Sequence, residues 1–210
     1  GFVGSTGSGK TTTMDLILGL LKPERGSIKI DGISIDDLNL RSWQSSIGYV
    51  PQTIFLSDNS IAENIAFGVE KKHIAMSYVE RASRIANLHN YVVNDLENGY
   101  NTIVGERGIR LSGGQRQRIA IARALYHCPD VLILDEATSA LDNITERAVM
   151  DAINNLERSI TIILIAHRLS TVRNCDNIYL LEKGNIEAKG TYESLKATNE
   201  TFLRMSINEQ

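Results

Sequence analysis

Gly4-Ser5-Thr6-Gly7-Ser8-Gly9-Lys10-Thr11 fits the pattern G-x-x-x-x-G-K-[ST] at every fixed position. It follows Gly1-Phe2-Val3, which has the composition of a buried strand, and it precedes residues 11–21, where apolar side chains recur at helical spacing. The glycines let the backbone turn tightly, so that consecutive N–H groups can point toward phosphate oxygens. The sequence therefore predicts a phosphate-binding loop between a strand and a helix.

The chemistry of this loop predicts ATP and Mg²⁺ as ligands. We expect Lys10 to contact the β- and γ-phosphates, the Thr11 hydroxyl to hold Mg²⁺ and Thr12 to contact the α-phosphate. The positive end of the helix that begins near Lys10 adds to the attraction for phosphate. The expected nucleotide-binding residues of the loop are Gly4, Ser5, Thr6, Gly7, Ser8, Gly9, Lys10, Thr11 and Thr12.

A second motif places two carboxylates at the end of a strand. Val131-Leu132-Ile133-Leu134 is a run of strand-forming apolar residues, and Asp135 and Glu136 follow it directly. A buried parallel strand carries such acids to the carboxyl edge of its sheet, where ligands bind. We expect Asp135 to coordinate the metal, through water, and Glu136 to act on the attacking water as a general base or orienting group.

Strand-like and helical runs alternate along the chain, which predicts an α/β fold with a mostly parallel sheet covered on both faces. We expect one domain over residues 1–210, with a helical subdomain at about 53–110 inserted in it. Two hairpins are expected, about Asp31-Gly32 and Lys183-Gly184. Further strands are predicted at 47–50, 131–134 and 160–165, and helices at 60–95, 112–127, 143–156 and 191–207.

The composition narrows the class of protein. The 210 residues are 42% hydrophobic and 22% charged, with a formal net charge of −3 and no basic block, which argues against a nucleic-acid partner. No apolar run approaches the roughly 18–20 residues that a membrane span requires. Cys128 and Cys175 lack the spacing of a metal site and are expected to be buried or half-buried reduced thiols.

Leu111-Ser112-Gly113-Gly114-Gln115 opens a further helix. Ser112 is a favourable N-cap, and the glycines expose backbone N–H groups at the positive end of the helix. On these residues alone, the segment is either a well-capped helix with a flexible start or a second phosphate site.

This pentapeptide resembles the signature motif of the ABC-type ATPases, and the family's other motifs follow in order over essentially the whole chain. Gln52 matches the Q-loop glutamine, Ser139-Ala140-Leu141-Asp142 the D-loop, and His167 the H-loop histidine. The resemblance implies a P-loop NTPase (RecA-like) core with an antiparallel β-subdomain, truncated here. It also implies that Gln52 senses Mg²⁺ and the attacking water, and that His167 holds the γ-phosphate and Glu136.

The resemblance further implies that two such domains close head to tail around two ATP molecules. The signature residues Ser112, Gly113, Gly114 and Gln115 would then bind the ATP held by the opposite domain, and Asp142 would lie at the interface. The expected catalytic residues are Glu136, His167, Gln52 and Lys10, and the expected metal-binding residues are Thr11, Gln52 and Asp135.

Two segments resemble the exporter branch of the family. Residues 104–108 resemble the exporter X-loop, and residues 60–65 resemble the segment that receives the coupling helices of a transmembrane domain. We therefore expect an ATPase that drives export or flipping at the cytoplasmic face of a membrane, docks its transmembrane domain through 54–68, and forms a homodimer. The apolar loop of Ile54, Phe55 and Leu56 suits a docking groove.

Two other classes stay open from the sequence: an importer ATPase subunit, and a soluble ABC ATPase of the DNA-repair or chromosome type. The short helical link between Gln52 and Leu111, without heptads, disfavours the second class. Because only three residues precede Gly4, we expect the sequence to begin inside a larger protein, with the adenine-stacking aromatic residue of the family upstream. The transported substrate does not follow from these residues.

Overall fold

A computed structural model describes residues 1–105, 108, 111–136, 140–154, 160–166 and 168–208. The chain divides into two compact units. The first unit contains residues 1–46 and 163–210, and the second contains residues 47–162.

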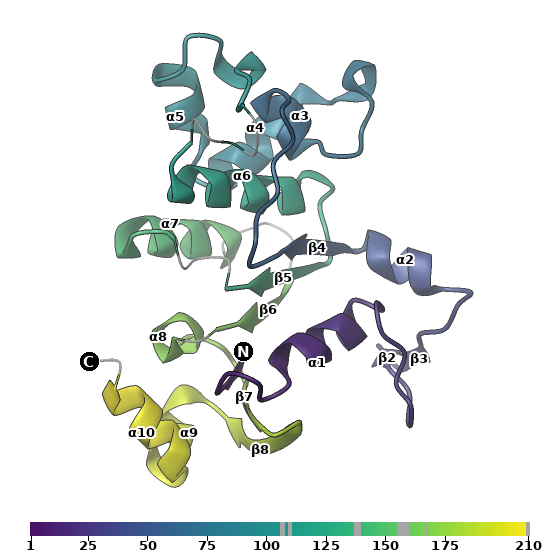
Figure 1. Cartoon of the computed structure of the whole chain (residues 1–210), viewed down its shortest axis with the longest axis vertical. Coiled ribbons are helices and arrows are strands. Elements are labelled where there is room, and N and C mark those ends of the chain that lie inside the picture. Colours follow the sequence, from purple (N-terminus) through teal and green to yellow (C-terminus); the bar gives the residue numbers. More distant parts are fainter. Residues whose placement is uncertain (106–107, 109–110, 137–139, 155–159, 167, 209–210) are drawn as a thin grey trace. The chain divides into compact units, whose positions relative to one another are not determined.

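The first unit is built around β1, β7 and β8 and residues 163–165 of β6, and these strands pair in the order β6-β1-β7-β8 (Figure 1). Strand β1 (Phe2–Gly4) pairs in parallel with β6 (Thr161–Ile165) and with β7 (Ile178–Glu182). Strand β8 (Asn185–Gly190) runs antiparallel to β7. The β7–β8 turn has positive φ at Lys183 and Gly184, which is the twist that a two-residue hairpin needs and which confirms the predicted hairpin.

Helix α1 (Lys10–Ile17) is shorter than the predicted helix of residues 11–21. Gly19 adopts φ of 69°, and the N–H groups of Leu20 and Leu21 turn back to the carbonyl oxygen of Asp15. A glycine in the left-handed conformation commonly ends a helix in this way. The helix therefore stops before residues 20 and 21, although the apolar spacing of the sequence extends to them. Leu20 and Leu21 are exposed.

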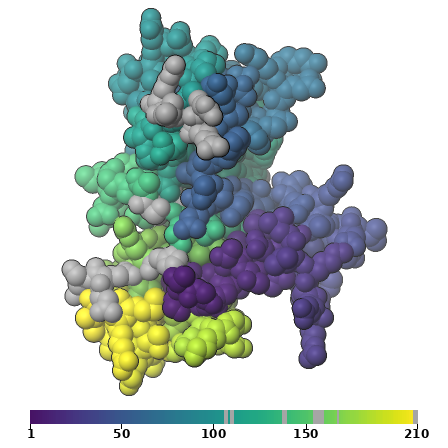
Figure 2. Space-filling view, in the orientation of Figure 1, coloured from purple at the N-terminus to yellow at the C-terminus, as the bar shows by residue number. Residues whose placement is uncertain are grey.

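Short elements complete the first unit. The hairpin predicted about Asp31-Gly32 is confirmed as β2 (Lys29–Ile30) and β3 (Ile33–Ser34). In the space-filling view its atoms stand away from the rest of this unit as an arm (Figure 2). The predicted helical end consists of α9 (Tyr192–Thr198) and α10 (Glu200–Asn208). Two helices were not predicted: α2 (Leu40–Ser45) and α8 (Leu169–Val172).

The second unit holds the parallel pair β4 (Ile47–Val50) and β5 (Val131–Asp135), in which Val50 is the partner of Leu134. Helix α6 (Gly113–Tyr126) packs on β4 on one side and on α3 (Ile61–Ile65) and α4 (Met76–Ile85) on the other (Figure 1). The remaining helices are α5 (His89–Asn94) and α7 (Asn143–Asn154), with 3₁₀ turns at Lys71–His73 and Gly99–Asn101.

Strand β4 approaches α6 closely because Gly48 has no side chain. A Cβ atom at Gly48 would lie 2.4 Å from the carbonyl oxygen of Ala124 and 2.9 Å from Pro129. Ile119, Ile121 and the middle of β5 are fully buried, so α6 and β5 form the core of this unit. Within residues 53–110 the described elements are helices and 3₁₀ turns; that they form a separate inserted subdomain stays a prediction.

Candidate nucleotide site

The glycine-rich loop in the first unit is held against the β7–β8 hairpin. A Cβ at Gly4 would lie 2.3 Å from the carbonyl oxygen of Leu181 and 2.7 Å from the Ser8 hydroxyl, so only glycine fits there. The N–H of Gly184 donates to the Ser8 carbonyl oxygen over 2.9 Å. Gly9, with φ of 102°, directly precedes α1. The loop thus has a fixed path between the strand and the helix.

Lys10 lies inside this loop. Its side chain is 6% exposed, and Nζ donates to the carbonyl oxygens of Gly4 at 2.8 Å and Ser5 at 3.0 Å. The buried Ser8 hydroxyl has no hydrogen-bond partner among the described residues. A buried polar atom of this kind ordinarily finds a partner, and phosphate oxygens are acceptors that both Lys10 and Ser8 could serve. The loop therefore fits a phosphate group.

The other predicted loop residues are open to solvent. Ser5, Thr6, Gly7, Thr11 and Thr12 are exposed. The hydroxyls of Thr11 and Thr12, in the first turn of α1, are therefore reachable by a metal ion or a phosphate.

In the second unit, the carboxyl ends of β4 and β5 bring three of the predicted residues together with one that was not predicted. Gln52 Nε2 donates to Glu136 Oε2 over 2.8 Å. Tyr49, which belongs to none of the sequence motifs, places its hydroxyl 3.5 Å from Asp135 Oδ2. The parallel register explains why Gln52 and Glu136 meet. Val50 and Leu134 are paired across the two strands, and each of the two residues lies two positions after its member of that pair.

Glu136 has an unusual backbone. Its φ of 51° lies in the left-handed region, which costs a residue other than glycine about 1–2 kcal/mol. Strained backbone of this kind occurs where the surroundings hold a residue in place, often at functional sites. The backbone of Glu136 is therefore in a conformation that its surroundings must hold.

Ser112 caps helix α6 as predicted. Its Oγ accepts from the N–H of Gln115 at 3.2 Å, and the Gln115 side chain accepts from the N–H of Ser112 at 2.7 Å. Because a hydroxyl can accept and donate at once, Ser112 can still offer its proton to a phosphate oxygen. Gln115, in contrast, uses its side-chain oxygen to close the capping box.

Gly113 and Gly114, the glycines of the pentapeptide, lie against Ala140. A Cβ at Gly113 would lie 3.5 Å from the Ala140 Cβ, and one at Gly114 would lie 3.4 Å from the Ala140 carbonyl oxygen. Two residues further on, Asp142 Oδ1 accepts from the N–H groups of Ile144 and Thr145 at 3.1 and 3.0 Å. These hydrogen bonds, chiefly with Thr145, lower the pKa of Asp142.

Several predicted residues lie outside the described part of the chain. They are His167, Ser139 of the D-loop, and Glu106 and Arg107 of the segment that resembles the X-loop.

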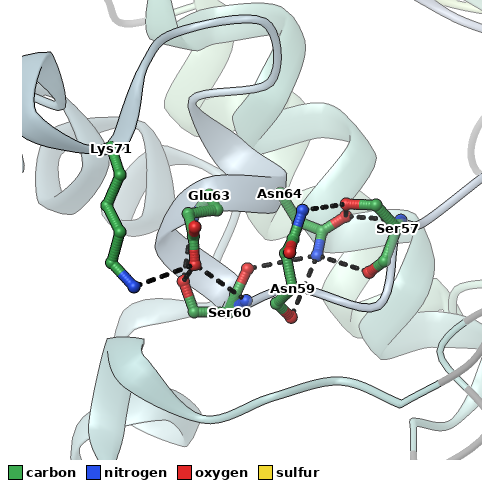
Figure 3. A network of polar contacts seen from close by, with 6 residues as sticks. All are labelled: Ser57, Asn59, Ser60, Glu63, Asn64 and Lys71. Carbon is green, nitrogen blue, oxygen red and sulfur yellow. Dashed lines mark hydrogen bonds and ion pairs between the residues drawn. The ribbon is translucent and has the colours of Figure 1, made fainter.

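The segment 54–68 is organised around Asn64, which is fully buried (Figure 3). The Asn64 amide donates to the carbonyl oxygens of Ser57 and Ser60 at 3.0 and 3.1 Å and accepts from the Ser57 N–H at 3.0 Å. Ser60 caps α3 in a capping box with Glu63, whose pKa is lowered chiefly by the hydrogen bond from the Ser60 hydroxyl. The loop before α3 is therefore tied to the helix itself.

Arg123 fastens this segment to α6. Its guanidinium donates to the carbonyl oxygens of Asn64 at 2.8 Å and Phe55 at 2.9 Å, and it lies 4.7 Å from the centre of the Phe67 ring. Burial lowers the pKa of Arg123. A planar, five-donor cation is suited to hold several backbone oxygens at once.

The expected docking groove needs a correction. Leu56 is only 1% exposed, and Ile61, Ala62 and Ile65 are also buried, so these side chains belong to the core of the second unit. The exposed apolar side chains of the segment are Phe55, at 60%, and Phe67, at 49%. The sequence alone could not separate these groups, because α3 is too short for a clear apolar period.

Two further findings concern helix length and the cysteines. Over the described residues, no helix is both long and apolar enough to cross a membrane. Cys128 and Cys175 are free thiols of intermediate burial.

Comparisons with known proteins identify the family of this chain. Residues 1–139 match the family described as "ABC transporter". The chain is 47% identical over 205 residues to ABC transporter B family member 22 of Arabidopsis thaliana, covering 98% of this chain and 17% of that protein. It is 47% identical over 193 residues to an ATP-dependent lipid A-core flippase of Saccharophagus degradans, covering 92% of this chain and 32% of that protein.

A solved structure of a bacterial Atm1-family ABC exporter with ATP bound superposes with a TM-score of 0.92 at 36% sequence identity. That match covers 99% of this chain and 36% of the exporter chain. The chain thus spans about a third or less of the length of these relatives. On these matches, the chain belongs to the ABC transporter family.

Proposed function

We propose that this chain binds ATP with Mg²⁺ and hydrolyses it, and that the full-length protein uses the hydrolysis to export or flip a substrate across a membrane. The observation that carries the proposal is the 2.8 Å hydrogen bond from Gln52 to the Glu136 carboxylate, in a chain that also has a phosphate loop with a buried lysine.

In this proposal Glu136 acts on the attacking water. The water oxygen bonds to the γ-phosphorus, the bond from the γ-phosphorus to the β-γ bridging oxygen breaks, and the carboxylate of Glu136 accepts the proton of the water. Gln52 holds that carboxylate in place. Lys10 and the N–H groups at the start of α1 attract the phosphates. They also stabilise the negative charge that develops on ADP as it leaves.

Mg²⁺ would supply positive charge that offsets the negative charge of the phosphates. Among the described residues there is no group of three or more His, Cys, Asp or Glu side chains that could hold a metal ion. Magnesium in phosphoryl transfer is ordinarily bound by one or two carboxylates together with phosphate oxygens and water. Asp135 would supply the carboxylate, through water, and the Thr11 hydroxyl and Gln52 would be the other two protein ligands.

We propose further that the functional unit is a homodimer, in which Ser112 and the first N–H groups of α6 contact the ATP held by the second copy. The exposed Ser112 and the small Gly113 and Gly114 leave that helix end accessible to a phosphate. Asp142, at the start of α7, would lie at the same interface. His167 would contact the γ-phosphate.

The partner for the exposed phenylalanines is proposed to be the transmembrane domain of the same polypeptide. Phe55 and Phe67 are exposed apolar side chains, and Arg123 contacts both residues. With that partner, the chain would lie at the cytoplasmic face of the membrane. The named relatives are transporters and an ATP-dependent flippase, which favours this function over an importer subunit or a soluble ATPase of DNA repair.

The proposal is tested by ATP binding and hydrolysis in the full-length protein. Lys10→Ala should lose ATP binding, because it removes the cation inside the loop. Lys22→Ala is the matched control, since Lys22 is exposed and pairs with Asp37 at 2.7 Å. Equal ATP binding by K10A and K22A, or a wild type without any ATP hydrolysis, would overturn the proposed function.

A further inference from the structure

Gln117 is a buried polar residue in the first half of α6. It is 2% exposed, and both ends of its amide are hydrogen-bonded to backbone. Its Oε1 accepts from the N–H of Ala140 at 2.9 Å, and its Nε2 donates to the carbonyl oxygen of Glu136 over a longer 3.4 Å. A buried amide is stable only when such partners satisfy it, so the position of Gln117 and those of its two partners depend on one another.

One partner of the Gln117 amide is the carbonyl oxygen of Glu136, the residue whose carboxylate the proposed reaction uses. Glu136 has the left-handed φ of 51°, and its side chain accepts the hydrogen bond of Gln52. A residue other than glycine keeps such a backbone only where its surroundings hold it. The hydrogen bond from Gln117 is one of the contacts that hold the Glu136 peptide.

The other partner of the Gln117 amide, Ala140, also lies against the start of α6. Ala140 is held at its N–H by Gln117, and it lies against Gly113 and Gly114 in the first turn of α6. A side chain at Gly114 would also approach Leu141, at 3.7 Å. The first turn of α6 and Gln117, one turn further along, therefore contact the same residue, Ala140.

We infer that Gln117 is a positioning residue that couples the first turn of α6 to the catalytic carboxylate of the same chain. A shift of the Ser112 end of α6, caused by a phosphate bound there, would move the Gln117 amide and with it the backbone of Glu136 and Ala140. This inference rests on the proposed function, because it assigns to Gln117 a role in the ATP hydrolysis proposed above.

The test compares variants of Gln117 in the full-length protein. Gln117→Met keeps the shape and loses both hydrogen bonds. It should lower kcat for ATP hydrolysis about tenfold, because small displacements of a catalytic group are costly. The KM for ATP should stay within about twofold of wild type, because the phosphate loop is unchanged. Gln117→Glu keeps the acceptor for Ala140 and, when ionised, sets a second acceptor against the Glu136 carbonyl oxygen in place of the donor, so its kcat should also fall.

A control variant must show that a loss of folding stability does not by itself lower kcat. Val92→Ala is the control, because Val92 is fully buried on α5 in the same unit and lies far along the chain from the carboxylates. V92A should lower the melting temperature and leave kcat near wild type at assay temperature. The inference is overturned if Q117M has wild-type kcat, or if V92A lowers kcat as much as Q117M does.

The outcomes separate this inference from the proposed function. If wild type hydrolyses ATP and Glu136→Gln does not, while both Gln117 variants are normal, only the role of Gln117 is wrong. If Glu136→Gln hydrolyses ATP like wild type, the proposed function itself fails. Should Q117M not fold, Q117E still tests the inference, because it should lower kcat without changing KM.

Discussion

Gln52 and Glu136 are 84 positions apart in the sequence, and the Gln52 amide donates to the Glu136 carboxylate over 2.8 Å. The two residues meet because β4 and β5 are parallel neighbours and each side chain follows the end of its strand. The glutamine thus restricts the orientation of a carboxylate whose own backbone is already in the left-handed region.

Removing this hydrogen bond should slow hydrolysis. Gln52→Ala leaves the Glu136 carboxylate without the donor, so we expect kcat to fall about tenfold or more at saturating ATP. Gln44→Ala is the control, since Gln44 donates to the Leu18 carbonyl oxygen in the first unit. An unchanged kcat in Q52A, measured by phosphate release, would remove Gln52 from the catalytic site.

Gly4 should not tolerate a side chain. A methyl group there meets the Leu181 carbonyl oxygen and the Ser8 hydroxyl, so Gly4→Ala should destabilise the protein by about 1–3 kcal/mol. Gly26→Ala is the matched control, because Gly26 also has positive φ and a methyl group there would meet no atom within 4 Å. Thermal unfolding should show a clearly larger loss for G4A than for G26A; equal losses would contradict the close packing of the loop on β7.

Arg123 should matter for stability more than an exposed arginine. Arg123→Met leaves the carbonyl oxygens of Phe55 and Asn64 without their donors, which should cost about 2–4 kcal/mol. Arg123→Lys should recover only part of this, since an ammonium cannot reproduce the planar set of donors. Arg84→Met, at an exposed pair with Glu80, should change the urea midpoint little. A similar midpoint for R123M and R84M would show that Arg123 does not hold the segment.

The pKa of Asp142 predicts an acid-sensitive start of α7. Because its folded-state pKa lies below the unfolded value, its contribution to stability is present above the unfolded pKa and is lost as the pH falls through the folded one. Between about pH 5 and pH 2, the urea midpoint of wild type should therefore fall more steeply than that of Asp142→Asn, whose neutral amide oxygen accepts at every pH. Parallel pH profiles for the two proteins would contradict this.

Much of the fold follows from local pattern, and the parts that do not have identifiable physical reasons. The loop before Lys10, strand β5 and the cap at Ser112 are determined by residues adjacent in sequence, so motif and period predicted them. The early end of α1 depended on Gly19, whose left-handed conformation outweighed the apolar spacing after it. The burial of Leu56 depended on packing against distant elements.

The candidate site shows the same division. The pairing of Gln52 with Glu136 could be expected from parallel strands, whereas the contacts of Gln117 could not. Gln117 lies between two arginines in the sequence, and its burial appears only once α6 packs against β4 and the segment after β5. The polar neighbours of Gln117 in the sequence suggest that it is exposed to solvent. Only its hydrogen bonds in the folded structure identify it as a candidate for positioning another residue.

The most direct test of the account is single-turnover cleavage of ATP by Glu136→Gln in the full-length protein. The amide keeps the size of the side chain and cannot accept the proton of the attacking water. The account predicts that ATP affinity stays within about twofold of wild type, while cleavage slows about a hundredfold or more and ATP-bound protein accumulates. Cleavage by E136Q at close to the wild-type rate would contradict it.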